Sequence, residues 1–126
     1  KILYVFILFF VIIGGGLYYK YEVYPYDWDA AEKSFELYTK AQHIDKDDIE
    51  SIEKSKQKKI GGIIYRVKYK SESNKNVVYE YTWCGDYTGE NYYHNMFLML
   101  TNKHGDGLDE NKTKHKYPII QKRIVD

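Results

Sequence analysis

The sequence has little of what builds disulfide frameworks, metal sites and nucleic-acid interfaces. Its single cysteine, Cys84, excludes an internal disulfide. Its 19 Lys and Arg residues nearly cancel its 18 Asp and Glu residues, so there is no net charge to hold nucleic acid. The histidines lack the three- or four-residue spacing typical of zinc ligands; they are His43, His94, His104 and His115. We therefore expect no metal, no cofactor and no nucleic-acid partner.

Catalytic motifs are also missing. The sequence has no P-loop, no serine elbow and no paired-carboxylate pattern. One enzymatic arrangement can be drawn, with Cys84 as nucleophile, His94 as base and Asp86 as the group that orients the imidazole. A cysteine beside tryptophan on a strand, however, is more typical of a small buried hydrophobe. We therefore predict that the protein is not an enzyme.

A short segment has the opening pattern of a calcium-binding loop. Residues 102–107 place possible oxygen ligands at the first, third and fifth positions and glycine at the sixth. The twelfth position is Thr113, where such a loop needs a bidentate glutamate. We therefore interpret the segment as a glycine-rich turn.

What the sequence does contain is a long apolar run at its start. Eighteen residues from Ile2 to Tyr19 are uncharged, and as a helix they would reach roughly 27 Å, close to the roughly 30 Å core of a bilayer. The bulky Leu17 and Tyr18 after three glycines do not suit signal-peptide cleavage. We interpret 1–19 as a transmembrane anchor, with a cleaved signal peptide and a buried core helix as weaker alternatives.

The next residues divide the anchor from a folded domain. We interpret 20–26 as an aromatic juxtamembrane segment, with one or two tyrosines near Trp28 joining the domain. Residues 27–126 then form one small extracytoplasmic α+β domain. An exported domain without disulfides favours a Gram-positive surface.

The domain is expected to begin with an amphipathic helix of about four turns. Asp27 and Asp29 can cap it after Pro25. The side chains of its predicted buried face recur every three or four residues: Trp28, Ala31, Phe35, Tyr38 and either Gln42 or Ala41.

Four strands are expected to follow as an antiparallel meander on which the helix packs. Residues 49–59 are a lysine-rich edge strand, and Gly61 and Gly62 predict a two-residue hairpin. Residues 63–70 and 77–83 alternate between apolar and polar, and 96–100 form a continuous apolar strand. Parity places one set of side chains on the face under the helix: Tyr65, Val67, Tyr69, Tyr79, Tyr81 and Trp83.

These features resemble a family of short, single-anchor membrane proteins of unknown function from low-GC Gram-positive bacteria. The resemblance is carried by the anchor and by Asp47-Asp48-Ile49, Gly61-Gly62, Tyr65, Val67, Tyr69-Lys70, Tyr79-Glu80-Tyr81 and Lys116-Tyr117-Pro118. It implies a location and a fold class, and it supplies no catalytic residue.

Two functions fit these expectations. The first is a single-pass, membrane-anchored binding or interaction module at the cell envelope, with its C-terminal domain outside. Its sheet edge, or the aromatic loop 86–94 with Tyr87, Tyr92 and Tyr93, would meet a peptide, an envelope polymer or another membrane protein. The second is a surface immunity or inhibitor protein that acts on a toxin or protease. The sequence does not identify the binding residues.

Overall fold

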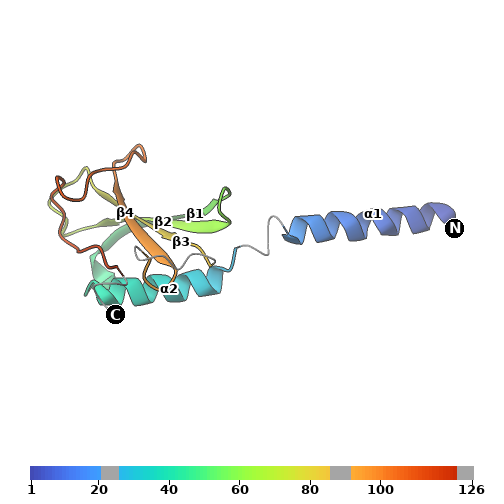
Figure 1. The fold of residues 1–126 in the computed structure, drawn as a ribbon, viewed down its shortest axis with the longest axis horizontal. Coiled ribbons are helices and arrows are strands. Elements are labelled where there is room, and N and C mark those ends of the chain that lie inside the picture. Colours follow the sequence, from blue (N-terminus) through green and yellow to red (C-terminus); the bar gives the residue numbers. More distant parts are fainter. Residues whose placement is uncertain (21–25, 86–91, 122–126) are drawn as a thin grey trace.

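The computed structural model describes residues 1–20, 26–85 and 92–121, which form an α+β fold (Figure 1). The helices are α1 (Ile2–Tyr18), α2 (Trp28–Ala41) and the short 3-10 helix η2 (Lys46–Asp48). The strands are β1 (Ile49–Gln57), β2 (Gly62–Tyr69), β3 (Val78–Trp83) and β4 (Met96–Thr101). Each strand pairs antiparallel with the next in the order β1-β2-β3-β4. The predicted four-stranded meander is confirmed.

The first helix, α1, is apolar and fully exposed. It has 17 residues, none of them buried, and its large apolar side chains are between 43% and 77% exposed. Figure 1 shows it standing clear of the sheet. Over the described ranges, no helix combines the length and the apolar character needed to cross a membrane.

The second helix, α2, supplies one layer of the core. Asp27 caps it by accepting a hydrogen bond from the Ala30 N–H at 3.0 Å, as predicted. Phe35 and Tyr38 are buried, but Trp28 is 40% exposed, so its predicted place in the core is wrong. Tyr26, only 7% exposed, joins the core cluster next to the start of the helix instead. Of the two described residues of the segment 20–26, Tyr26 therefore belongs to the packed domain.

The sheet buries the face that strand parity predicts. Tyr65 pairs with Tyr81 and Val67 with Tyr79, so these four side chains share one face, and each is 0% exposed. The ring centroid of Phe35 lies 4.7 Å from that of Tyr65 and 5.0 Å from that of Tyr81. The core is therefore an aromatic layer between α2 and the central strands.

The hairpin between β1 and β2 differs from the predicted two-residue turn. Gln57 pairs with Gly62, which leaves residues 58–61 as a four-residue connection. Gly61 has a φ of 66°, the left-handed conformation that favours glycine. Gly62 belongs to β2, and a Cβ there would lie 2.6 Å from the backbone oxygen of Trp83. The first glycine makes the turn, and the second allows β3 to approach closely.

Removing one ring from the aromatic layer should strongly destabilise the domain. We expect Phe35→Ala to lower the free energy of unfolding by about 3 to 5 kcal/mol, because it leaves a cavity against Tyr65 and Tyr81. The control Lys68→Ala, exposed on the same sheet, should change it by less than about 0.5 kcal/mol. Denaturant unfolding of the full chain in detergent micelles measures both, and equal midpoints would contradict the buried register.

Candidate functional site

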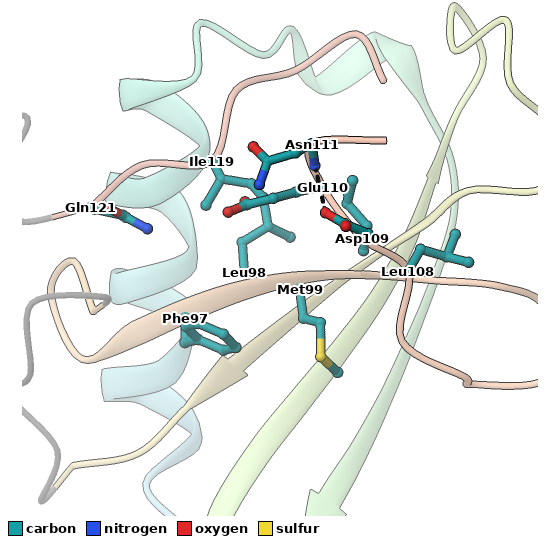
Figure 2. Close-up of a pocket in the computed structure, with 10 residues that line it drawn as sticks. Phe97, Leu98, Met99, Leu108, Asp109, Glu110, Asn111, Ile119 and Gln121 are labelled. Carbon is teal, nitrogen blue, oxygen red and sulfur yellow. Dashed lines mark hydrogen bonds between the residues drawn. The ribbon is translucent and has the colours of Figure 1, made fainter. Parts of the chain in front are cut away.

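A hollow of the described surface runs along the outer edge of β4. It is a groove of about 350 Å³, bounded by β4, by residues 108–111 and by residues 119–121 (Figure 2). Its lining consists of Phe97, Leu98, Met99, Leu100, Leu108, Asp109, Glu110, Asn111, Ile119 and Gln121. We call it the β4-edge groove. Its volume falls in the range of small ligand sites.

The chain itself already covers both ends of this strand edge. The Tyr93 N–H donates to the Met96 oxygen at 2.9 Å, and the Leu108 N–H donates to the Leu100 oxygen at 2.8 Å. Backbone groups alternate in direction along a strand, so Leu98, midway between them, also points its N–H and C=O outward. Among the described residues, no hydrogen bond to these two groups is formed. One residue of β4 is therefore open for pairing, inside the groove.

The groove has two walls of different chemistry. In Figure 2, Leu98 points toward Ile119 and Glu110, while Phe97 and Met99 project from the opposite face of β4. Phe97 and Met99 are half-buried, and they give that face an apolar surface. The groove therefore wraps around the strand edge, with a mixed wall on the side of α2 and an apolar wall on the other.

The wall on the α2 side is rich in hydrogen-bond acceptors. It carries the carboxylates of Asp109 and Glu110, and the side-chain oxygen of Gln121. Burial raises the pKa of the Tyr38 hydroxyl, and the negative charge of Glu110 contributes to the increase. Gln121 Oε1 is buried and has no hydrogen-bond partner within the described ranges. An acceptor without a partner is costly, and together with the two carboxylates it makes this wall rich in acceptors.

This wall is held by the segment 116–121, which we call the C-terminal strap. The Tyr38 hydroxyl donates to the Ile120 oxygen and accepts from the Ile120 N–H, both at 2.8 Å. The Gln42 side-chain amide donates to the Pro118 oxygen at 2.8 Å. Side chains of α2 and of its C-terminal cap, Gln42, thus satisfy backbone groups of the strap that a sheet would otherwise pair.

Two buried hydrogen-bond networks, one around Tyr81 and one around Tyr79, support these bonds. Tyr81 donates to Gln42 Oε1 at 2.8 Å, and its oxygen lies 2.7 Å from that of Tyr69. Tyr79 accepts the backbone N–H groups of Lys116 and Tyr117, each at 3.1 Å. Burial raises the pKa of Tyr81, so its hydroxyl stays protonated and able to donate at physiological pH.

The carboxylate of Glu72 completes the hydrogen-bond network around Tyr79. Glu72 is 3% exposed and accepts from the Tyr79 hydroxyl at 2.5 Å and from the Lys116 N–H at 2.8 Å. Burial alone would raise its pKa, but these bonds and one from the Asn74 N–H lower the pKa below its ordinary value. Asp48 fastens the strap from outside, because it accepts from the hydroxyls of Ser71 and Tyr117 and its pKa is also lowered.

The sequence did not single out the residues that form this site. The sequence offers Gln42 only as an alternative to Ala41 at the end of the apolar helix face, Glu72 looks like a solvated residue, and Gln121 lies in no periodic segment. The signal that could have pointed to them is the excess of tyrosines, because each buried hydroxyl needs a polar partner.

The cysteine arrangement drawn from the sequence is not assembled among the described residues. Cys84 is 2% exposed, and its thiol lies 3.5 Å from the Ile60 oxygen rather than against His94. The ring of His94 lies 4.4 Å from that of Tyr93. Asp86 falls outside the described residues. The prediction that the protein is not an enzyme stays a prediction.

The segment 102–107 forms the predicted turn. Asn102 Oδ1 accepts from the N–H groups of His104 and Asp106 at 2.8 and 3.1 Å, and Gly105 has a φ of 86°. The oxygen expected as the first calcium ligand therefore serves the turn's own backbone. Over the described ranges, no three His, Cys, Asp or Glu side chains gather as a metal site.

The aromatic loop 86–94 is only partly described. Residues 86–91, Tyr87 included, lie outside the described residues. Tyr92 and Tyr93 are half-buried, with the Tyr92 ring 5.5 Å from Phe97 and the Tyr93 ring 6.1 Å from Tyr38. Of the three tyrosines named from the sequence, these two pack against the domain rather than standing free.

Comparison with family models, with curated proteins and with solved structures gave no significant match to this chain. The resemblance to a single-anchor membrane family therefore stays a prediction.

The buried hydrogen bonds of the Glu72 carboxylate make the stability of the domain depend on pH. Since the folded-state pKa of Glu72 is lowered, its contribution is complete above the ordinary value of 4.5 and is lost as pH falls through the lower folded value. We expect the free energy of unfolding to fall more steeply below pH 4.5 in the wild type than in Glu72→Gln, which keeps an acceptor but cannot titrate. Denaturant unfolding from pH 6 down to about pH 3 measures both slopes. Parallel curves would contradict this role for Glu72.

Proposed function

We propose that the chain is a membrane-tethered, non-catalytic binding module and that the β4-edge groove is its binding site. The observation that carries the proposal is the open backbone of Leu98 at the centre of a groove that the chain's own segments close at both ends. An unpaired strand edge is a ready template for another chain. A module of this kind needs recognition chemistry and no reactive group.

A second hollow of the described surface supports a binding site less well. It measures about 110 Å³ and lies on the face of the sheet opposite α2, among Ser51, Glu53, Arg66, Lys68, Val78 and Lys103. Arg66 already donates to the Asn102 oxygen at 2.9 Å. This hollow is small for a ligand, and its charges of both signs lie close together.

The exposed helix α1 supports the tether. Seventeen residues with no buried side chain present a continuous apolar surface, which is unfavourable in water. The apolar residues occupy every face of the helix, a pattern that favours immersion in lipid over adsorption at its surface. At about 1.5 Å per residue α1 reaches roughly 26 Å, so a single pass would require the bilayer to thin or flanking residues to enter it.

We predict that α1 retains the domain at a membrane, with the domain outside. The chain, produced in a Gram-positive host, should stay with the membrane fraction after a carbonate wash. Replacing Phe9 and Ile12 by lysine should release it, because each charge costs about 2.5 to 3.5 kcal/mol in the centre of a bilayer. Protease added to intact, wall-stripped cells should digest the domain. Protection of the domain, or release of the unmodified chain, would count against the tether in this orientation.

We also predict that a partner binds at the groove. A photoreactive benzoyl-phenylalanine in place of Met99 should give one discrete crosslinked product in intact cells. The same group in place of Ser55, exposed on β1, is the control and should not give it. Equal products from both positions, or none from Met99, would contradict the groove as the binding site. A toxin or protease in the product would favour the inhibitor alternative, which differs only in the partner.

A further inference from the structure

We propose that the β4-edge groove binds an extended peptide with an apolar-basic-apolar pattern, its basic residue lying opposite Leu98. This inference rests on the proposed function and specifies the partner's chemistry. It combines three properties of the groove. One strand position is open, the two walls lie on opposite faces of β4, and one wall is rich in hydrogen-bond acceptors.

The open strand position selects an extended polypeptide. The outward N–H and C=O of Leu98 offer one donor and one acceptor to a neighbouring strand. The same edge already takes two segments of this chain in that way, at Tyr93 and at Gly107, each in an antiparallel bridge. A third segment between them would continue the pairing that the fold uses on either side. Only a polypeptide backbone repeats donor and acceptor at the matching spacing.

Because side chains alternate between the two faces of a strand, each side chain of a bound peptide would meet one of the two walls. A residue paired with Leu98 points its side chain to the face on which Leu98 points, where Glu110 and Ile119 lie (Figure 2). Its two neighbours point to the other face, toward Phe97 and Met99. The central residue therefore meets the mixed wall and the flanking residues meet the apolar wall.

The acceptors of the mixed wall require a donor-rich central residue. Glu110 is exposed and negatively charged, and neither of the ion pairs found over the described ranges involves it. Gln121 Oε1 is a buried acceptor without a partner in the same ranges. Lysine and arginine carry several N–H donors, a positive charge and no acceptor, so they complement the exposed Glu110 carboxylate. An acidic central residue would meet repulsion from Asp109 and Glu110.

The outer edge of β1 does not offer the same combination. Its lysines, Lys54 and Lys56, stack over the rings of Tyr65 and Tyr26 at 5.3 and 4.6 Å from the centroids. β1 carries both signs of charge, with Glu50 and Glu53 beside these lysines, and Lys54 also pairs with Glu32. Strand addition of a basic segment is therefore expected at β4 rather than at β1.

The test uses the full chain in detergent micelles and the blocked peptide acetyl-Val-Lys-Val-amide, which is short enough to lie between the segments at Tyr93 and Leu108. Two matched peptides are the controls, one with glutamate in place of lysine and one N-methylated at its lysine, which removes the backbone donor opposite Leu98. We expect each change to weaken binding at least about fivefold. Glu110→Gln should weaken binding of the lysine peptide by a similar factor, and Glu50→Gln, a carboxylate on β1, should not. The Leu98 amide resonance should shift on titration with the lysine peptide.

The inference is overturned if the three peptides bind alike, if none binds, or if Leu98 is unperturbed. That failure is distinct from failure of the proposed function. A discrete crosslinked product from Met99 together with no peptide selectivity would leave the module in place and remove only its basic-peptide partner. Loss of the crosslinked product as well would remove both.

Discussion

The fold depends on polar partners for the hydroxyls of four buried tyrosines; a fifth, Tyr65, has none among the described residues. Tyr38, Tyr69, Tyr79 and Tyr81 are at most 2% exposed, and each places an oxygen in the interior. A buried hydroxyl without a hydrogen bond costs about 1 to 3 kcal/mol, a large share of the stability of a small domain. Here the partners come mostly from outside the sheet, from Gln42, Glu72 and the backbone of the C-terminal strap. The aromatic layer and the strap are therefore one structural unit.

The hydrogen bonds of the buried tyrosines also determine where the β4-edge groove lies. Tyr38 binds both backbone groups of Ile120, which fixes the residue on each side of it: Ile119 and Gln121 line the groove. The opposite boundary is fixed by the Leu108 N–H on the Leu100 oxygen. Both boundaries are thus set by hydrogen bonds to rigid elements rather than by loose loops. A site preorganised in this way loses little conformational entropy when a ligand enters it.

The sequence predicts the parts of the fold that local patterns determine. Alternation along β2 and β3 identifies the buried face, since parity alone decides which side chains share it. Periodicity and the Asp27 cap locate α2. The error at Trp28 has a physical cause, because helical spacing describes a face of the helix but not how far the sheet extends beneath it. The error at Gly62 is similar: a close approach of β3 needs glycine as much as a turn does.

The candidate site could not be predicted in the same way, because its contacts join distant residues without a repeating pattern. Tyr38 and Ile120 are 82 positions apart, and Gln42 and Pro118 are 76 apart.

The two edges of the sheet also show why the groove exists at all. An open meander must protect two edge strands. β1 is the predicted edge strand, and its side chains are mostly polar or charged. On β4 the residues between Met96 and Leu100 are apolar, so protection has to come from neighbouring segments, and Tyr93 and Leu108 supply it at the two ends. Because both segments leave the edge after a single bridge, the middle position at Leu98 is left open. The opening is thus a consequence of covering an apolar edge with two short segments, and the acidic residues at its rim limit which chains can use it.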